Sequence, residues 1–401
     1  MKKTLAILLA MAMLIACLAG CGEKKEAEPS GSETKEPETI TIAFIGNTTG
    51  DYAMYGIPVR NAVKLFYDKL NAEGGINGKQ INLLEYDDKA DPTESVNALN
   101  LAIENGATAI IGSVLTGATV ALSDATFEIN MPEITASATS PKVTVADPDD
   151  PNSEVKTNVF RSCFLDPFQG EKMAQYAAEI CGAKRVAIFY ETGSDYSEAI
   201  VTGFYTGATA YPQLEVVDME AFSTGDKDYR SQMTNIAASN PDVVLMPIYY
   251  GEAGLAITAL RAAGCDAQVI GGDGFGSVKD YASAEDLEGT VYFSGYAPGT
   301  DSVAQFEADY KATYGEDVPN MFAPLAWDAS LIMTEGLKAA EAAGLTPGSD
   351  EYKQAIIDAI KGMDAFEGIT GSYTFNETND PVKSVAVIKL SGGNEEFDSF
   401  F

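Results

Sequence analysis

The stretch TITIAFIGNTTGDYAMYGIPVRNAVKLFYDKLNAEGG, residues 39–75, predicts how the chain folds. Residues 39–46 form a short apolar run that is typical of a buried strand. After a polar loop, apolar side chains recur at helical spacing at Val59, Ala62, Val63, Phe66 and Leu70. Gly74 and Gly75 are typical of a helix end. The stretch therefore predicts a strand, a loop and a helix in succession.

The alternation of strand and helix continues in two series. In the first series, further strands are expected at residues 81–87, 109–112 and 132–135. In the second series, strands are expected at residues 186–190, 214–219, 243–248 and 268–272. Helix-length segments separate these strands, which indicates parallel sheets with helices on both faces. We therefore predict an α/β chain of two doubly wound parallel-sheet lobes, with the ligand site in the cleft between them.

The composition narrows the classes of function. The 401 residues carry 26 Lys and Arg against 59 Asp and Glu, a formal net charge of −33. This charge argues against nucleic acid or an anionic lipid surface as a partner, and a well-solvated surface explains it. The chain contains no histidine, which excludes Ser–His and Cys–His nucleophile pairs and histidine-ligated metals. Since no nucleophile motif is present either, we expect a protein that is not an enzyme and needs no cofactor.

The cysteines and the acidic runs indicate neither a disulfide framework nor a metal site. The five cysteines are Cys17, Cys21, Cys163, Cys181 and Cys265. The last three form no CxxC pair and are expected to be small buried hydrophobic residues, with a Cys163–Cys181 disulfide left open. The acidic runs at residues 87–88, 147–150 and 226–228 lack EF-hand spacing, so we expect solvated loops there.

The amino terminus is predicted to direct export. Two lysines precede an apolar run at residues 5–15 that is too short for a membrane span and typical of a signal peptide. The run is followed by LAGC, residues 18–21, which resembles the lipobox of bacterial lipoproteins. We predict a lipoprotein signal peptide at residues 1–20 and lipidation of Cys21. The alternatives are a secretory signal without lipidation and the weaker pattern that ends at Cys17.

Residues 21–38 are polar and charged, with proline and glycine but no large apolar side chain. Such a segment buries too little surface to fold, so we predict a flexible tether. No later run is long and apolar enough to span a membrane. We therefore expect an exported protein that its lipid holds at the outer face of the bacterial cytoplasmic membrane. In a Gram-negative host this face borders the periplasm.

Hydroxyl residues follow two of the expected strands. Thr116 begins the helix expected after residues 109–112, and Ser137 and Thr139 lie in the turn after residues 132–135. Helix amino termini and such turns bind anions through backbone N–H groups and hydroxyls, so a carboxylate fits here. The simpler explanation is that these residues only cap the helix and form the turn.

The glycine-rich segment VIGGDGFGS, residues 269–277, follows another expected strand. It lacks the GxGxxG spacing and the GK[ST] ending of phosphate loops, and the carboxylate of Asp273 would repel phosphate. Asp273 suits an ammonium group instead, although a simple Asx-turn also explains it. Aromatic candidates for a ligand cleft, each of which ordinary packing also explains, are Tyr55, Tyr196, Tyr249 and Trp327.

From residue 40 to its end, the chain resembles the leucine/isoleucine/valine-binding proteins of ABC importers, which are type I periplasmic binding proteins. The resemblance rests on NAEGGINGKQINLLEYDDKADP (71–92), TASATSP (135–141), FRSCFLDPFQG (160–170), DYRSQMTNIAASNPDVVLMPIYYGEAG (228–254) and IGGDG (270–274). Together these segments are specific, although no single one is.

The resemblance implies a role for each candidate residue. It implies that the hydroxyls and amides of Thr116 and Thr139 hold the carboxylate of an amino acid. It implies that the carbonyl of Ser137, together with Thr139 and Asp273, holds the ammonium group. It also implies that aromatic side chains line the cleft at Tyr55, Tyr196, Tyr249 and Trp327.

The chain departs from the family pattern at three places. Some members have a disulfide where this chain has Lys89 and Leu115, so that bridge is absent. Asp273 stands where some members have glutamate, and Thr116 stands where some have serine. The resemblance therefore implies that the sites for the carboxylate and the ammonium group of the ligand are kept, while the ligand side chain that the protein selects stays open.

We expect residues 39–160 and 295–370 to form the first lobe and residues 161–294 and 371–401 the second. The resemblance implies a monomer that captures a branched-chain or other apolar amino acid by hinge closure and delivers it to an ABC permease. Three alternatives stay open: another small polar solute such as an amide, a short peptide or an aromatic acid; a ligand sensor; and an α/β enzyme acting through carboxylates. A neighbouring permease and ATPase gene would separate transport from sensing.

Overall fold

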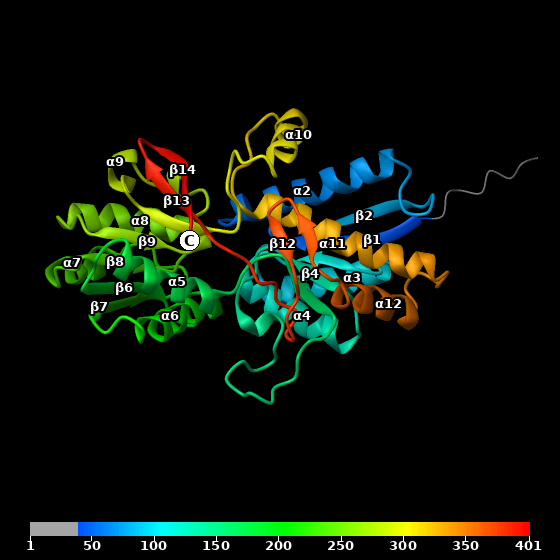
Figure 1. Cartoon of the computed structure of the whole chain (residues 1–401), viewed down its shortest axis with the longest axis horizontal. Helices are drawn as coiled ribbons and strands as arrows, with labels where there is room; N and C mark the ends of the chain where they lie inside the picture. Colours follow the sequence, from blue (N-terminus) through cyan, green and yellow to red (C-terminus); the bar gives the residue numbers. More distant parts are fainter. Residues whose placement is uncertain (1–38) are drawn as a thin grey trace, which may run out of the picture. The chain divides into compact units, whose positions relative to one another are not determined.

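The structure is a computed structural model that describes residues 39–401 (Figure 1). The signal peptide, the tether and the lipidation of Cys21 that we predict from the sequence lie outside the described residues. Within residues 39–401, no helix combines the length and the apolar character that a membrane crossing requires.

The first lobe is built on a parallel sheet with the strand order β2-β1-β3-β4-β5. Its strands are β1 (Thr39–Gly46), β2 (Gln80–Asp87), β3 (Ile110–Gly112), β4 (Glu133–Thr135) and β5 (Val159–Arg161). Its helices are α2 (Ala53–Ala72), α3 (Pro92–Glu104), α4 (Thr116–Glu128), α11 (Phe322–Ala342) and α12 (Asp350–Lys361). The four strands expected from the first series are confirmed to within two residues, whereas β5 was not expected.

Strand β1 shows why this sheet is covered on both faces. Ile42 and Phe44 point to one face and belong to the hydrophobic cluster that contains the buried side of α2. Ala43 and Ile45 point to the other face and pack in the cluster that contains the buried side of α3. Because successive side chains of a strand alternate between faces, a run that is apolar throughout requires a helix on each side.

The second lobe is built on a sheet with the strand order β14-β13-β10-β9-β8-β6-β7. Its parallel strands are β6 (Arg185–Glu191), β7 (Glu215–Phe222), β8 (Val243–Met246), β9 (Gln268–Gly271) and β10 (Val291–Ser294). The antiparallel edge, which was not expected from the sequence, is β13 (Ala386–Ser391) and β14 (Asn394–Phe400). Its helices are α5 (Asp166–Glu179), α6 (Asp195–Ala208), α7 (Arg230–Ala238), α8 (Tyr250–Ala262) and α9 (Ala284–Leu287).

Within the described residues, the chain passes between the two sheets three times. The connections lie between β5 and α5, between β10 and α10 (Ala304–Tyr314), and between β12 (Gly371–Tyr373) and β13. Strand β12 pairs with β11 (Phe366–Gly368) in a hairpin, so the third connection begins after Tyr373 rather than at the predicted boundary after residue 370. We place the hinge of the two lobes in these connections.

The three cysteines in the described part of the chain are free, so the disulfide that the sequence left open between Cys163 and Cys181 is not formed. Cys163 and Cys265 are buried, as expected, and Cys181 is half-buried. Burial raises the pKa of the Cys163 thiol to about 12, so this side chain is a neutral packing residue.

Candidate functional site

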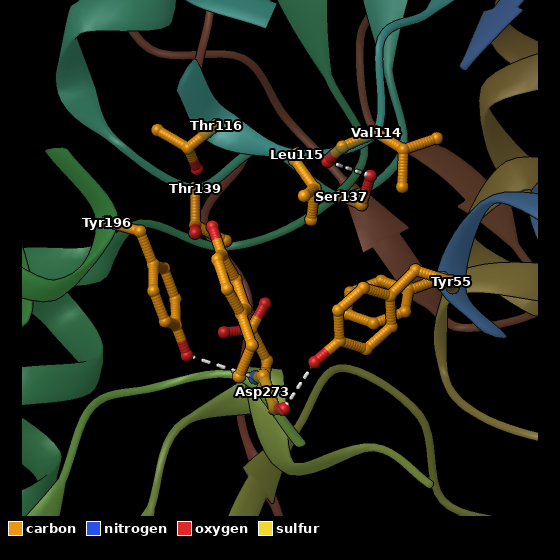
Figure 2. Close-up of a pocket in the computed structure, with 11 residues that line it drawn as sticks. Tyr55, Val114, Leu115, Thr116, Ser137, Thr139, Tyr196 and Asp273 are labelled. Carbon is orange, nitrogen blue, oxygen red and sulfur yellow. Dashed lines mark hydrogen bonds between the residues drawn. The ribbon is translucent and has the colours of Figure 1, made fainter. Parts of the chain in front are cut away.

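The candidate residues from the two lobes, apart from Trp327, lie around one cavity (Figure 2). Its walls are Tyr55, Val114, Leu115, Thr116, Ser137, Thr139, Tyr196, Tyr249, Asp273, Gly274 and Phe322. Figure 2 shows Thr116 and Thr139 together on one side of the cavity and Asp273 on the opposite side.

The amino terminus of α4 supplies backbone donors to the first side. Leu115 precedes the helix in an extended conformation and offers no capping side chain, and the buried Thr116 is the first helical residue. The first N–H groups of a helix have no partner within the helix, and the helix dipole gives them partial positive charge. This end of α4 can therefore accept an anionic group.

Residues 136–140, which we call the hydroxyl turn, supply side-chain donors to the same side. Thr135 Oγ1 accepts hydrogen bonds from the N–H groups of Ser137 (3.3 Å) and Ala138 (3.2 Å). The Ser137 hydroxyl donates to the carbonyl of Val114 (2.7 Å), which ties the turn to the loop before α4. Thr139 is 1% exposed, and its hydroxyl makes no hydrogen bond of standard geometry among the described residues, although it interacts with the Asp166 carboxyl. The hydroxyl can therefore turn to a ligand atom in the cavity without breaking a well-formed hydrogen bond.

Asp273 occupies the opposite side, at the start of a short 3₁₀ turn after β9, and is 1% exposed. The side-chain amide of Gln169 donates to Asp273 Oδ1 (3.0 Å), and its oxygen accepts from the Asp273 N–H (2.9 Å). The same Gln169 nitrogen donates to Asp166 Oδ1 (3.1 Å), so one amide bridges two buried carboxyl groups. Burial raises the pKa of Asp273 to about 6, and burial together with Asp273 raises that of Asp166 well above its usual range.

The sequence reasoning missed Asp166 and Gln169, which contact Asp273 or each other, as well as the cavity walls Val114, Leu115, Gly274 and Phe322. Asp166 and Gln169 lie in FRSCFLDPFQG, which carried the family resemblance but no proposed role. The available signal was an acid followed three residues later by an amide, a spacing that puts both side chains on one face of a helix, but no helix was predicted where α5 begins. That signal does not reveal Asp273 as the common partner.

Tyrosine side chains form the walls that join the two sides. The rings of Tyr196 and Tyr249 stack with centroids 4.8 Å apart. The Tyr196 hydroxyl accepts from the Gly274 N–H (3.0 Å), and the Tyr55 hydroxyl donates to the Gly274 carbonyl (2.5 Å). Burial raises the pKa of all three tyrosines well above the usual range, so the phenols are neutral. Phenols from both lobes therefore hold the backbone of the residue after Asp273.

Trp327 is not in the cavity, and its assignment as a cleft aromatic was wrong. It lies on α11, where its ring centroid is 5.0 Å from that of Phe66 and 5.4 Å from that of Phe306. The ammonium group of Lys69 lies 5.7 Å from the same ring. The indole is therefore part of the packing between α2, α10 and α11, and Phe322 at the start of α11 lines the cavity instead.

The arrangement provides hydroxyl and backbone N–H donors on one side, an acid on the other, and apolar and aromatic walls between them. Two doubly wound lobes with such a site between them define the class of type I periplasmic binding proteins. The chain belongs to this family, since the family model described as "Periplasmic binding protein" matches residues 39–394. The family places the protein outside the cytoplasm.

Two curated relatives extend over most of the chain. The Leu/Ile/Val-binding protein BraC3 of Rhizobium johnstonii is 30% identical over 85% of this chain and 88% of its own length. The leucine-, isoleucine-, valine-, threonine-, and alanine-binding protein of Pseudomonas aeruginosa is 27% identical over 86% of this chain and 87% of its own length. Since these relatives are binding proteins, they confirm the prediction that the chain is not an enzyme.

Solved structures agree with the fold. The branched-chain amino acid transporter substrate-binding protein LivJ of Streptococcus pneumoniae, in complex with isoleucine, has a TM-score of 0.80 and 28% identity, covering 90% of this chain and 99% of that chain. The leucine-binding protein LivK of Thermotoga maritima has a TM-score of 0.78 and 27% identity over the same shares. A solute-binding protein of R. palustris in complex with benzoate has a TM-score of 0.77 at 21% identity, covers 90% of this chain and 96% of that chain, and supports the fold alone.

Proposed function

We propose that this protein captures a free amino acid in the cavity between its lobes. The observation that carries the proposal is the placement of Thr116 and Thr139 across one buried cavity from Asp273. The two hydroxyls and the amino terminus of α4 would bind the α-carboxylate. Asp273 and the carbonyl of Ser137 would bind the α-ammonium group. A molecule with both charges close together satisfies both sides at once.

We further propose that the side chain of the ligand is apolar, with leucine, isoleucine and valine as the first candidates. The remaining wall is made by Val114, Leu115, Tyr55 and Phe322. A charged side chain there would be desolvated without a partner, which is costly. An aromatic acid without an amino group would leave Asp273 unpaired in the same cavity, which disfavours that alternative. The names of the similar proteins BraC3, LivJ and LivK point to the same ligand class.

The described conformation contains contacts between the lobes that we assign to the closed state. The Tyr250 hydroxyl donates to the Asp51 carbonyl (2.5 Å), and Lys142 pairs with Asp195 (2.6 Å). We propose that the ligand favours this conformation because it bonds to both lobes at once, which shifts the population towards closure. The closed form would then deliver the amino acid to the permease of an ABC importer.

A thermal-shift screen of the proteinogenic amino acids tests the proposed function. A ligand that binds only the folded protein raises its stability, by about 2.7 kcal/mol when present at a hundred times its Kd. We expect the largest shifts with leucine, isoleucine or valine, and we expect calorimetry to confirm one site per chain. Benzoate and leucinol, which lack the ammonium and the carboxylate group respectively, serve as controls. A shift with benzoate but with no amino acid would overturn the proposal.

The affinity for an amino acid is expected to rise with pH between about 5 and 7. The pKa of Asp273 is raised to about 6 because the group is buried, so without ligand the protonated form predominates below about pH 6. Its contribution to the stability of the ligand-free fold is therefore complete at low pH and is lost as pH rises through about 6. The ammonium group of the ligand requires the ionised form of Asp273. Below about pH 6 the affinity should therefore decrease with each unit of pH, with a limiting slope of about tenfold per unit. Calorimetry across this range measures the slope, and a constant affinity would contradict the assignment.

We propose that lipid on Cys21 anchors the protein to the membrane. In cells that express the full chain, Cys21→Ser should move the protein from the membrane fraction to the soluble exported fraction. Cys17→Ser is the matched control, because it removes the neighbouring cysteine and should leave the protein with the membrane. Labelling with a radioactive fatty acid should be lost only in the first variant. Retention of label in Cys21→Ser would show that another residue is lipidated.

A further inference from the structure

Behind the hydroxyl turn, Arg161 at the end of β5 is 0% exposed and is surrounded by hydrogen-bond acceptors. Its guanidinium group donates to the carbonyls of Ala138 (2.8 Å) and Ser140 (3.0 Å). These two carbonyls flank Thr139. The carbonyl of Thr139 itself accepts from the N–H of Asp166 (2.9 Å). All three carbonyls therefore accept hydrogen bonds from Arg161 or Asp166, which lie on either side of the first connection between the lobes.

The charge partner of Arg161 comes from the third connection. Asp380 is 3% exposed, and its Oδ1 lies 2.7 Å from Arg161 Nε. The Thr144 hydroxyl lies between the two groups, since it accepts from Arg161 (3.1 Å) and donates to Asp380 Oδ1 (3.2 Å). A buried charge is costly unless it is paired and hydrogen-bonded. Asp380 pairs with Arg161, whose two terminal nitrogens donate hydrogen bonds, whereas Nε lies close to Asp380 Oδ1 without a hydrogen bond of standard geometry.

Asp380 itself is fixed in a short turn, residues 376–380, which we call the C-terminal turn. Asn376 Oδ1 accepts from the Asp380 N–H (2.9 Å), and the Asn376 N–H donates to the Asp380 carbonyl (3.0 Å). Asn379 adopts a left-handed conformation (φ 61°) and donates to the carbonyls of Thr157 and Val159, which lead into β5. The C-terminal turn is thus attached to the strand that carries Arg161.

We propose that Arg161 and Asp380 are positioning residues for ligand binding. They hold the hydroxyl turn in the geometry that presents Thr139 to the cavity, and they tie this geometry to the third connection of the hinge. Neither side chain lines the cavity. Their effect on the ligand is therefore indirect, through the carbonyls on either side of Thr139. The ligand part of this inference rests on the proposed function, whereas the ordering of the turn does not.

The first test uses the ligand-free protein, so that it is independent of the ligand. Asp380→Asn should speed hydrogen–deuterium exchange of the Ser137 and Ala138 amides, which are bonded to Thr135 in the native turn. Glu133→Gln is the matched control. It alters another buried carboxyl at the opposite end of β4, where Glu133 accepts from Thr126, and it should leave these amides unchanged. Equal exchange in Asp380→Asn and wild type would overturn the proposal.

The second test is a double-mutant cycle read by calorimetry with L-leucine, or with the amino acid that gives the largest thermal shift. Asp380→Asn should weaken binding at least tenfold in the wild-type background but less than threefold in Thr139→Val, because both changes act on the same contact. A role confined to global stability would weaken binding equally in both backgrounds, and that result would refute the coupling. Glu133→Gln should leave the affinity within twofold of wild type.

A milder variant covers the case in which Asp380→Asn does not fold. Thr144→Val keeps the side-chain shape and removes the hydroxyl between Arg161 and Asp380. Thr144→Val should also speed exchange of the Ser137 and Ala138 amides and should also be non-additive with Thr139→Val, although both effects should be smaller than those of Asp380→Asn. Exchange at the wild-type rate in Thr144→Val would overturn the proposal. The wild-type protein could bind no amino acid while the variants still show faster exchange of the Ser137 and Ala138 amides. In that case the proposed function fails, whereas the role of Arg161 and Asp380 in ordering the hydroxyl turn stands.

Discussion

Asp273→Ala is expected to abolish amino-acid binding. In the complex that we propose, the ligand ammonium is desolvated in a cavity whose acid is Asp273, which is 1% exposed. Removing one partner of a buried ion pair costs about 3–5 kcal/mol, because the other charge stays buried without compensation. This cost corresponds to a loss of affinity of roughly 200- to 5,000-fold. Isothermal titration calorimetry of the purified protein measures it directly.

Two further variants separate charge from shape. Asp273→Asn keeps the size of the side chain and its ability to accept from Gln169. Its affinity should be nearly as low as that of Asp273→Ala, since the negative charge is what the ammonium group requires. Asp280→Asn is the matched control on the same loop, because Asp280 is exposed, and it should bind like wild type. Near-normal affinity of Asp273→Ala would remove this residue from the ligand site.

Gly274→Ala is expected to lower the affinity at least tenfold while the protein stays folded. A methyl group at this position would lie 2.7 Å from the Tyr196 hydroxyl and 2.8 Å from the carbonyl of Ile248. Both distances are shorter than carbon–oxygen contacts allow, so the Tyr196 side chain or the loop must move. Such a movement disturbs the bonds from the Gly274 backbone to Tyr196 and Tyr55, which join the two sides of the cavity.

Gly251→Ala provides the comparison for this substitution. Gly251 lies in the first turn of α8, and a methyl group there would meet no atom within 4 Å. Alanine in a helix is favoured over glycine by about 0.5–1 kcal/mol, so the melting temperature should stay the same or rise. Binding should be unchanged. Equal affinities for the two variants would show that close contact around Gly274 does not matter for the ligand.

Local patterns predicted most of the parallel strands. Residues 42–45 and 243–248 are apolar throughout because helices cover both faces of each sheet, and this property is visible in a short window. The antiparallel edge was not visible in the same way. Strand β14 alternates between exposed and half-buried residues, and its place in the sheet depends on pairing with β13. Strand β13 itself belongs to this sheet because it pairs with β10, which is far from it in the sequence.

Trp327 shows how a local argument about a side chain can fail. From the sequence, a lone tryptophan is compatible with a ligand wall and with core packing. The orientation of α11 decides between them, because its face towards α2 and α10 carries Trp327. Phe322 lies five positions earlier on the same helix and meets Tyr55 at the cavity, with ring centroids 5.0 Å apart.

By itself, the sequence determined the class of fold and the candidate ligand-binding hydroxyls and acid, because each of these depends on the local pattern of a single strand, turn or helix start. Only the tertiary structure decided what these groups face. Gln169 and Asp273 are 104 positions apart and meet because α5 packs against the loop after β9. Arg161 meets Asp380 because the third connection returns to β5. Such contacts depend on where whole elements pack, and a short window of sequence carries no information about that.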